Sequence, residues 1–181
     1  MVADGSPADD RLLAISRAID RWQTRLGQAV AWLTLIMVVL TFSIVALRYV
    51  FDAGWIALQE SVVWMHACVL LLAMGYTLCL DQHVRVDVFY RKLSPPAQAW
   101  VNLLGVVLLL WPTAALIGFG SYDYVAASWA VSESSSQSGG LPGLYILKTL
   151  LPLSALLLAI QGLSLALKSA STLLLERSRR P

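Results

Sequence analysis

Four long stretches of the chain are almost free of charged residues, and they define its organisation. The stretches are residues 26–47, 61–80, 97–120 and 144–167. The only residues with readily ionised side chains in them are His66 in the second stretch and Lys148 near the start of the fourth. About 20 apolar residues at a rise of 1.5 Å per residue cross a hydrocarbon core of about 30 Å. The pattern therefore predicts an all-α integral membrane protein with four transmembrane helices.

The segment before the first stretch has a different pattern. Its apolar residues recur at steps of three or four from Leu12 to Leu26, which places them on one side of a helix. A basic side with a tryptophan on the apolar side is typical of a helix that lies in the membrane interface. The candidate membrane-surface anchors are Ile15, Ile19 and Trp22 on the apolar side and Arg17, Arg21 and Arg25 on the basic side. Residues 11–25 are therefore expected to form an N-terminal interfacial amphipathic helix, with a solvated start to the first span as the alternative.

Basic residues are distributed unevenly between the ends of the four stretches. Of the 13 lysines and arginines, four precede the first stretch, three lie between the second and third, and four follow the fourth. Basic residues favour the cytoplasmic side of a membrane. Both termini are therefore expected in the cytoplasm, with residues 168–181 as a basic cytoplasmic tail. No signal-peptide pattern is recognised near residue 1, so the expectation is a single membrane domain over residues 1–181.

The overall composition excludes two other classes of protein. Hydrophobic residues make up 58% of the chain and charged residues 13%, with a mean hydropathy of +0.70. A soluble domain has about 25% charged residues, and a disordered chain has low hydrophobicity. Neither class fits.

Local signals refine the third span. Ser94 followed by Pro95 and Pro96 predicts a helix start, with the serine hydroxyl as a cap. Pro112 leaves the carbonyl of the residue four positions earlier without its helical partner, which predicts a kink. The spacing of Tyr122, Val125 and Trp129 predicts that the helix continues amphipathically beyond residue 120.

Few residues could carry chemistry. The histidines His66 and His83 are 17 residues apart, about 25 Å along a helix, so they cannot ligate one haem. Cys68 and Cys79 are about 16 Å apart by the same measure, beyond the reach of a disulfide. No spacing matches a zinc or iron-sulfur site, a catalytic triad or a phosphate loop. The sequence predicts neither an enzyme nor a cofactor or metal site. Lys148 is expected to extend its stem towards the membrane surface, in preference to a buried ion pair.

Polar residues gather on both sides of the second span. On the side opposite the termini these are Arg48, Asp52, Trp55 and Glu60. Arg48 and Asp52 are spaced for an i, i+4 pair, and Glu60 is expected to open a helix near its positive dipole end. These local roles explain part of the cluster, and contact with another protein is the alternative. All four are candidate partner-interface residues.

On the side of the termini the candidates are His83, Arg85 and Asp87. A short interfacial helix is expected to start near Asp87, with Asp87 as its N-cap. Arg85 could bind lipid headgroups or a carboxylate of a partner. The three residues complete the set of candidate interface residues.

The order of these features resembles the small permease (Q) subunit of tripartite ATP-independent periplasmic (TRAP) transporters. The residues that carry the resemblance are Arg48-Tyr49-Val50-Phe51, Trp55, Glu60, Gly75, His83-x-Arg85-Val86-Asp87, Glu133-Ser134, Leu141-Pro142, Pro152-Leu153 and Gln161-Gly162. The resemblance covers nearly the whole chain beyond about Ile19. It implies a rigid membrane scaffold in the bacterial inner membrane and no nucleic-acid partner.

The resemblance also implies partners. These are a large, many-span permease subunit that moves substrate in an elevator-like motion coupled to sodium, and a soluble periplasmic binding protein that docks on the outer face. The interfacial segments would contact phospholipid. Family members often carry two adjacent acids where this chain has Gln59-Glu60, which puts any role that needs both carboxylates in doubt. The Gly139-Gly140-Leu141-Pro142 and Lys148 segments resemble a branch linked to mannitol and chloroaromatic compounds, whose expected substrates are oxo- or hydroxy-carboxylates.

Other classes of function remain as alternatives. A self-sufficient small exporter acting as an antiparallel dimer needs a membrane-embedded acid and a weak charge bias. A membrane anchor of a redox complex needs suitably placed ligands. A generic assembly factor needs neither.

Overall fold

The computed structural model describes residues 7–83 and 87–178, which form helices and connecting segments without a strand. The helices are α1 (Pro7–Phe51), α2 (Ile56–Leu72), α3 (Met74–Cys79), α4 (Asp87–Tyr90), α5 (Pro95–Gly105), the π-helical segment η1 (Val106–Leu110), α6 (Trp111–Gly120), α7 (Tyr122–Ala130) and α8 (Leu144–Ser178). Four helical units are long and apolar enough to cross a membrane. The expectation of an all-α protein with four such helices is confirmed.

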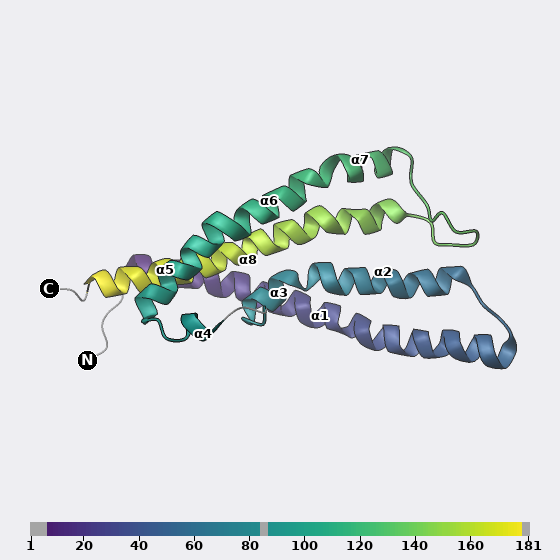
Figure 1. The fold of residues 1–181 in the computed structure, drawn as a ribbon, viewed down its shortest axis with the longest axis horizontal. Helices are drawn as coiled ribbons and strands as arrows, with labels where there is room; N and C mark the ends of the chain where they lie inside the picture. Colours follow the sequence, from purple (N-terminus) through teal and green to yellow (C-terminus); the bar gives the residue numbers. More distant parts are fainter. Residues whose placement is uncertain (1–6, 84–86, 179–181) are drawn as a thin grey trace.

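Helix α8 is the centre of the arrangement. It contacts α1, α2, α3, α5, η1, α6 and α7. Figure 1 shows the two ends of the chain at one end of the molecule, which we call the termini end, and the α1–α2 and α7–α8 connections at the other, the loop end. This arrangement agrees with an even number of spans, because α1 and α8 then run antiparallel.

Helix α1 continues through residues 11–25 into the first span. It is a single helix of 45 residues, about 67 Å long at 1.5 Å per residue, with no interruption near residue 25. Polar side chains of residues 16–23 pack against α8, which supports this continuity. The placement of residues 11–25 in the membrane interface stays a prediction.

The second unit begins earlier than expected. Helix α2 starts at Ile56, five residues before the predicted boundary, and the unit is interrupted at Ala73 before α3. Glu60 therefore lies beyond the first turn of α2 and does not open the helix. The glycine after the interruption, Gly75, is buried against α1.

The third unit is irregular beside Pro112, the position at which the sequence predicted a kink. The π-helical segment η1 lies directly before Trp111 and Pro112, and the backbone N–H of Trp111 donates to the carbonyl of Val106. A π turn is one way in which a helix adjusts its hydrogen bonds beside a proline. The predicted start at Pro95 and the extension as α7 are confirmed, but the hydroxyl of Ser94 forms no capping hydrogen bond.

Three helices end at non-glycine residues in the left-handed conformation. The φ values of Asp52, Asp81 and Ser132 are 49°, 57° and 48°. Asp52 directly follows α1, whereas Asp81 and Ser132 lie two positions after the ends of α3 and α7. After α3 the N–H of Asp81 donates to Leu78 and the N–H of Gln82 to Thr77, the two bonds of a Schellman motif. Aspartate is among the few residues that adopt this conformation readily. Asp52 thus ends a helix, and no ion pair joins it to Arg48 among the described residues, so that predicted pair is wrong.

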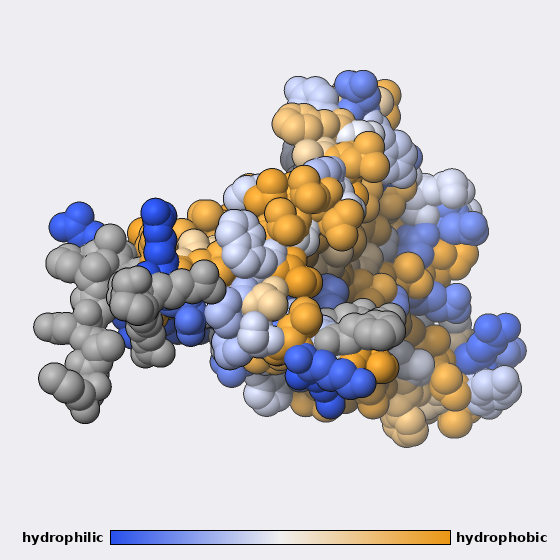
Figure 2. Space-filling view, turned by 60° about the vertical axis from the view of Figure 1, so that its left-hand side comes forward, coloured by the Kyte–Doolittle hydropathy of each residue, from blue (hydrophilic) through white to orange (hydrophobic). Residues whose placement is uncertain are grey.

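The distribution of polarity is inverted relative to a soluble protein. Side chains exposed on the described surface include Trp32 at 68% and Phe42 at 73%, whereas several serines and glutamines are buried. Figure 2 shows apolar residues across much of one face, with hydrophilic residues in separate groups. Without water outside, helices associate through small residues, close packing and polar contacts. The arrangement is therefore that of a membrane-embedded bundle.

Candidate functional site

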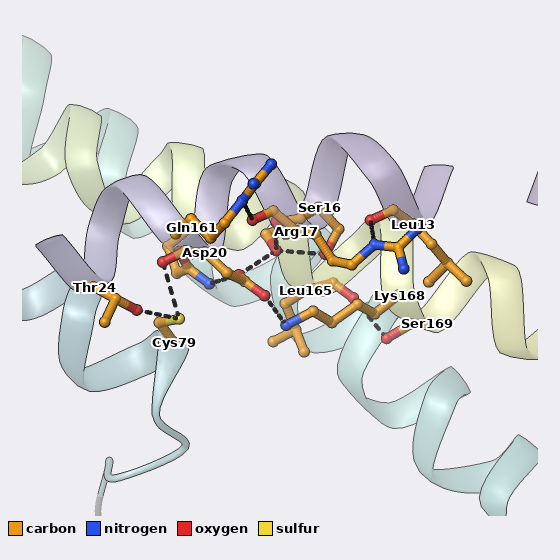
Figure 3. Close-up of polar contacts among 12 residues, drawn as sticks. Leu13, Ser16, Arg17, Asp20, Thr24, Cys79, Gln161, Leu165, Lys168 and Ser169 are labelled. Atoms are coloured by element: carbon orange, nitrogen blue, oxygen red, sulfur yellow. Dashed lines mark hydrogen bonds and ion pairs between the residues drawn. The ribbon is translucent and has the colours of Figure 1, made fainter. Parts of the chain in front are cut away.

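The most extensive polar contact lies between α1 and α8, near the termini end. The carboxylate of Asp20 accepts hydrogen bonds at Oδ1 from Gln161 Nε2 at 2.9 Å and Ser164 Oγ at 2.7 Å. Its Oδ2 lies 2.5 Å from Lys168 Nζ. The hydroxyls of Ser16 and Ser164 are 2.8 Å apart. Figure 3 shows Ser16 and Asp20 of α1 facing Gln161 and Lys168 of α8. We call these four residues and Ser164 the Asp20 cluster.

Sequence spacing explains why these residues meet. Ser16, Asp20 and Gln23 are separated by four and three positions, so they share one side of α1. On α8, Gln161, Ser164 and Lys168 are separated by three and four positions. Antiparallel packing of the two helices places one polar row against the other. The donors Gln23 Nε2, Gln161 Nε2 and Ser164 Oγ find acceptors in the opposite helix, whereas the amide oxygens of Gln23 and Gln161 have no hydrogen-bond partner among the described residues.

Gln23 extends the contact towards the middle of the bundle. Its side chain is fully buried, and Nε2 donates to the carbonyl of Leu157 at 2.8 Å. The backbone of Gly75 lies directly against it: a Cβ at Gly75 would come within 2.4 Å of Gln23 Nε2. One turn further, a Cβ at Gly27 would come within 2.1 Å of the Tyr76 ring. These two glycines let α1 and α3 approach closely.

Cys79 adds a weak contact to the same region. Its sulfur lies 3.9 Å from the carbonyl oxygen of Asp20 and 3.9 Å from Thr24 Oγ1. Both cysteines are free thiols, as expected from their separation. Among the described residues no group of three or more His, Cys, Asp and Glu side chains could hold a metal ion.

A second polar contact fastens the α7–α8 connection to α2 at the loop end. The hydroxyl of Ser135 donates to Glu60 Oε1, and the N–H of Leu141 donates to Glu60 Oε2 at 2.6 Å. Gly140 lies so close that a Cβ there would be 2.7 Å from Glu60 Oε2. We call this arrangement the Glu60 clasp. One carboxylate thus holds two points of a serine-rich and glycine-rich connection.

The same connection is also fastened to α8. Lys148 Nζ pairs with Glu133 Oε2 and lies 4.1 Å from the centre of the Tyr124 ring. The hydrogen bond from Lys148 is the main reason that the pKa of Glu133 lies below its ordinary value of 4.5. The expectation that Lys148 extends freely to the surface in preference to an ion pair is therefore wrong. The acid partner lies 15 residues away across a loop, where no helical spacing reveals it.

The candidate interface residues do not form one site. Arg48, Asp52 and Trp55 are exposed at the loop end, where only Glu60 of the set is engaged with another segment. His83 is exposed at the other end of the α2–α3 unit. The candidate interface residues therefore form two groups, one at each end of the α2–α3 unit.

The remaining two candidates are only partly described. Arg85 lies outside the described residues. Asp87 is the first residue of the short helix α4, which confirms a helix start there, but its side chain is not described, so a capping role stays a prediction. Helix α4 is joined to α5 through Asn102 Nδ2, which donates to the hydroxyl of Tyr90 at 2.9 Å.

The candidate membrane-surface anchors point away from the bundle. Ile15 and Trp22 are 51% and 49% exposed, Ile19 is half-buried, and the three arginines are exposed. Arg17 and Arg21 each donate from Nε to the backbone carbonyl one turn earlier. Exposure leaves these side chains available to lipid, and the anchoring role stays a prediction.

The Asp20 cluster and the Glu60 clasp were not predicted from the sequence. The Asp20 cluster had a visible signal, because polar residues at three-and-four spacing on two helices indicate matching polar sides. The apolar stripe of residues 12–26 lies on the neighbouring side of the same helix, about 90° away at roughly 100° per residue. The clasp had no such signal, because its partners are 75 and 81 residues from Glu60.

The fold and the site together define a helical membrane protein whose interior ionic groups pair with one another and whose surface is apolar. A family model described as "Tripartite ATP-independent periplasmic transporters, DctQ component" matches residues 14–172. The chain belongs to this family and is the small membrane component of a TRAP transporter. Searches of curated proteins and of solved structures find no match. The family works with the DctM and DctP components of the transporter and is not a family of enzymes.

Proposed function

We propose that this chain is a static scaffold of the transporter and takes no direct part in moving substrate. The observation that carries the proposal is the contrast between a closed polar interior and an open apolar exterior. Asp20 is bound by Lys168, Gln161 and Ser164 of the same chain. Helix α2, in contrast, has no buried residue in the isolated chain.

A transport pathway has different requirements. Coupling ions and substrates need polar groups at mid-membrane that exchange partners during the cycle. In the described interior the charged groups are already paired within the chain and lie towards the two ends of the bundle. A large apolar surface with a fixed polar interior suits a component that binds a many-span partner and stays in place while part of that partner moves.

The finer features follow from the family resemblance. We propose a large, many-span permease subunit as the partner in the membrane and a periplasmic binding protein that delivers an oxo- or hydroxy-carboxylate. Uptake is coupled to sodium in this proposal. The chain resides in the bacterial inner membrane with both termini in the cytoplasm, as the bias of basic residues favours.

Copurification tests the partner directly. The tagged chain is extracted from native membranes in mild detergent, and the intact masses of copurifying proteins are measured. The proposal expects one large membrane protein at equal stoichiometry. Recovery of the chain alone as a homodimer that binds a small molecule would contradict it and favour the exporter alternative.

Variants of the candidate interface and anchor residues test the scaffold role. Charge reversal at Arg85 and Asp87 should reduce recovery of the complex if these residues face the partner, and full recovery would place them against lipid.

Replacing Ile15, Ile19 and Trp22 by Asp should reduce membrane anchoring and uptake at equal expression. The exposed Asp10→Asn variant on the same helix is the matched control, and unchanged uptake in the triple variant would count against anchoring.

A further inference from the structure

A groove opens between α5 and α8 at the termini end, apart from both polar clusters. Its volume is about 440 Å³, and its lining includes Trp100 and Leu103 of α5 and Ala170, Leu173, Glu176 and Arg177 of α8. Trp100 is 54% exposed. Neither the Glu176 nor the Arg177 side chain forms an ion pair with another described residue.

The groove has a charged end and an apolar end. Helix α5 begins at Pro95 and α8 finishes at Ser178, both at the termini end, so the two helices run in opposite directions there. Moving into the bundle, the lining changes from Arg177 to Ala170 on α8, a distance of about 10 Å over seven residues. Leu103 lies at the inner end on α5. An occupant must therefore be charged at one end and apolar along its length.

The charges at the mouth restrict the occupant further. A guanidinium group binds phosphate oxygens through paired N–H donors. The neighbouring carboxylate of Glu176 favours a cation that can donate hydrogen bonds. A headgroup with a phosphate followed by a primary ammonium satisfies both, and an exposed tryptophan is typical of the level at which headgroups lie.

The inner lining of the groove suits a hydrocarbon chain. Leu103, Ala170 and Leu173 offer only apolar side chains there. An extended acyl chain fits along these three residues.

We propose that this groove is a binding site for a phospholipid with an ethanolamine headgroup. The phosphate lies at Arg177, the ammonium group at Glu176, and one acyl chain follows the apolar lining between α5 and α8. The lipid wedges the start of α5 against the end of α8. The inference is independent of the scaffold proposal, because it concerns contacts within this chain and lipid alone.

Native mass spectrometry of the full chain tests the site. The protein is purified in mild detergent, depleted of lipid and incubated with phosphatidylethanolamine or phosphatidylcholine of identical acyl chains. The expected result is one bound phosphatidylethanolamine per chain, retained about tenfold more than phosphatidylcholine, because a quaternary ammonium group donates no N–H bond to Glu176. Equal retention of the two lipids would overturn the proposal.

Variants locate the binding. Arg177→Ala should lower retention of phosphatidylethanolamine about tenfold, and Glu176→Gln should remove the preference over phosphatidylcholine. The exposed Arg11→Ala on α1 at the termini end is the matched control and should retain the lipid. Equal losses in Arg11→Ala and Arg177→Ala would show non-specific adsorption and overturn the site.

Two further measurements test whether the groove binds something other than a phospholipid. Ala170→Trp fills the groove and should abolish retention, while a melting curve reports whether the variant folds; if it does not, the two charge variants still decide. Phosphoethanolamine without acyl chains should not compete at equal concentration, because the apolar lining contributes to binding. Effective competition, or displacement of the lipid by a copurifying protein subunit, would overturn the assignment to a phospholipid.

Discussion

The carboxylate of Asp20 in α1 lies 2.5 Å from the ammonium group of Lys168 in α8, and this ion pair is one of the contacts that join the first and last long helices. Gln161 and Ser164 donate to the other oxygen of the same carboxylate. Three groups of α8 therefore depend on one acceptor in α1. This dependence makes the pairing of α1 with α8 selective, because a shift of one residue would separate the polar rows.

Removing that acceptor should loosen the bundle. Asp20→Ala leaves three donors of α8 without their partner, and we expect the free energy of unfolding to fall by about 2 kcal/mol. The measurement is unfolding in mixed micelles with increasing SDS, followed by circular dichroism. Asp10→Ala, exposed on the same helix, is the control and should change stability by less than about 0.5 kcal/mol. Equal effects of the two variants would show that the Asp20 cluster contributes little.

Close approach of α1 and α3 should not tolerate a methyl group. Gly27→Ala places a Cβ within 2.1 Å of the Tyr76 ring, and the bulk should lower the free energy of unfolding by about 1 to 3 kcal/mol. Gly105→Ala is the matched control, because nothing lies within 4 Å of a Cβ there. Alanine is a better helix former than glycine, so this control should be neutral or stabilising by up to about 1 kcal/mol. A stable Gly27→Ala protein would contradict the close packing.

The Glu60 clasp should protect a specific amide. Glu60→Ala removes the acceptor of the Leu141 N–H, and hydrogen exchange of that amide should accelerate by about tenfold. Exchange measured by mass spectrometry on peptides covering residues 132–143 checks this. Gln59→Ala, exposed on the adjacent position, should leave the rate unchanged. Unaltered exchange in Glu60→Ala would mean that the connection is held by other contacts.

The ion pair of Glu133 and Lys148 should make the stability of the protein depend on pH. The hydrogen bond from Lys148 lowers the folded-state pKa of Glu133 below its ordinary value of 4.5, so the deprotonated form favours folding. Its contribution is fully present at neutral pH, begins to decline as the pH falls towards 4.5, and is lost below the folded-state pKa. The melting temperature of the native protein should therefore exceed that of Glu133→Gln at pH 7, and the difference should shrink as the pH falls below 4.5. A constant difference across this range would contradict the ion pair.

How far the sequence predicts this protein depends on the range of the interactions involved. The four spans follow from the absence of charge in residues 26–47, 61–80, 97–120 and 144–167, since a hydrocarbon core excludes charged side chains. The irregularity at Pro112 is equally local, because proline removes a hydrogen bond of its own helix. Such features depend on neighbours within a few positions.

The errors share a cause. The predicted Arg48 and Asp52 pair relied on spacing within a helix, but Asp52 lies at φ 49° beyond the end of α1. The predicted free Lys148 ignored Glu133, which reaches it from across a connection. The apolar stripe of residues 11–25 likewise gave no indication that a polar row beside it packs on α8.

By itself, the sequence determined that this chain is a four-span helical membrane protein, and the order of its motifs indicated the family. Only the tertiary structure decided that Ser16, Asp20 and Gln23 form a row that packs against α8 and that Lys168 pairs with the Asp20 carboxylate. It also decided that the Glu60 carboxylate binds residues 135 and 141. The physical reason is that crossing a membrane depends on the transfer free energy of each segment. Polar pairing within the bundle depends on which helix faces meet, and residues 75 to 148 positions apart become neighbours only when the helices pack.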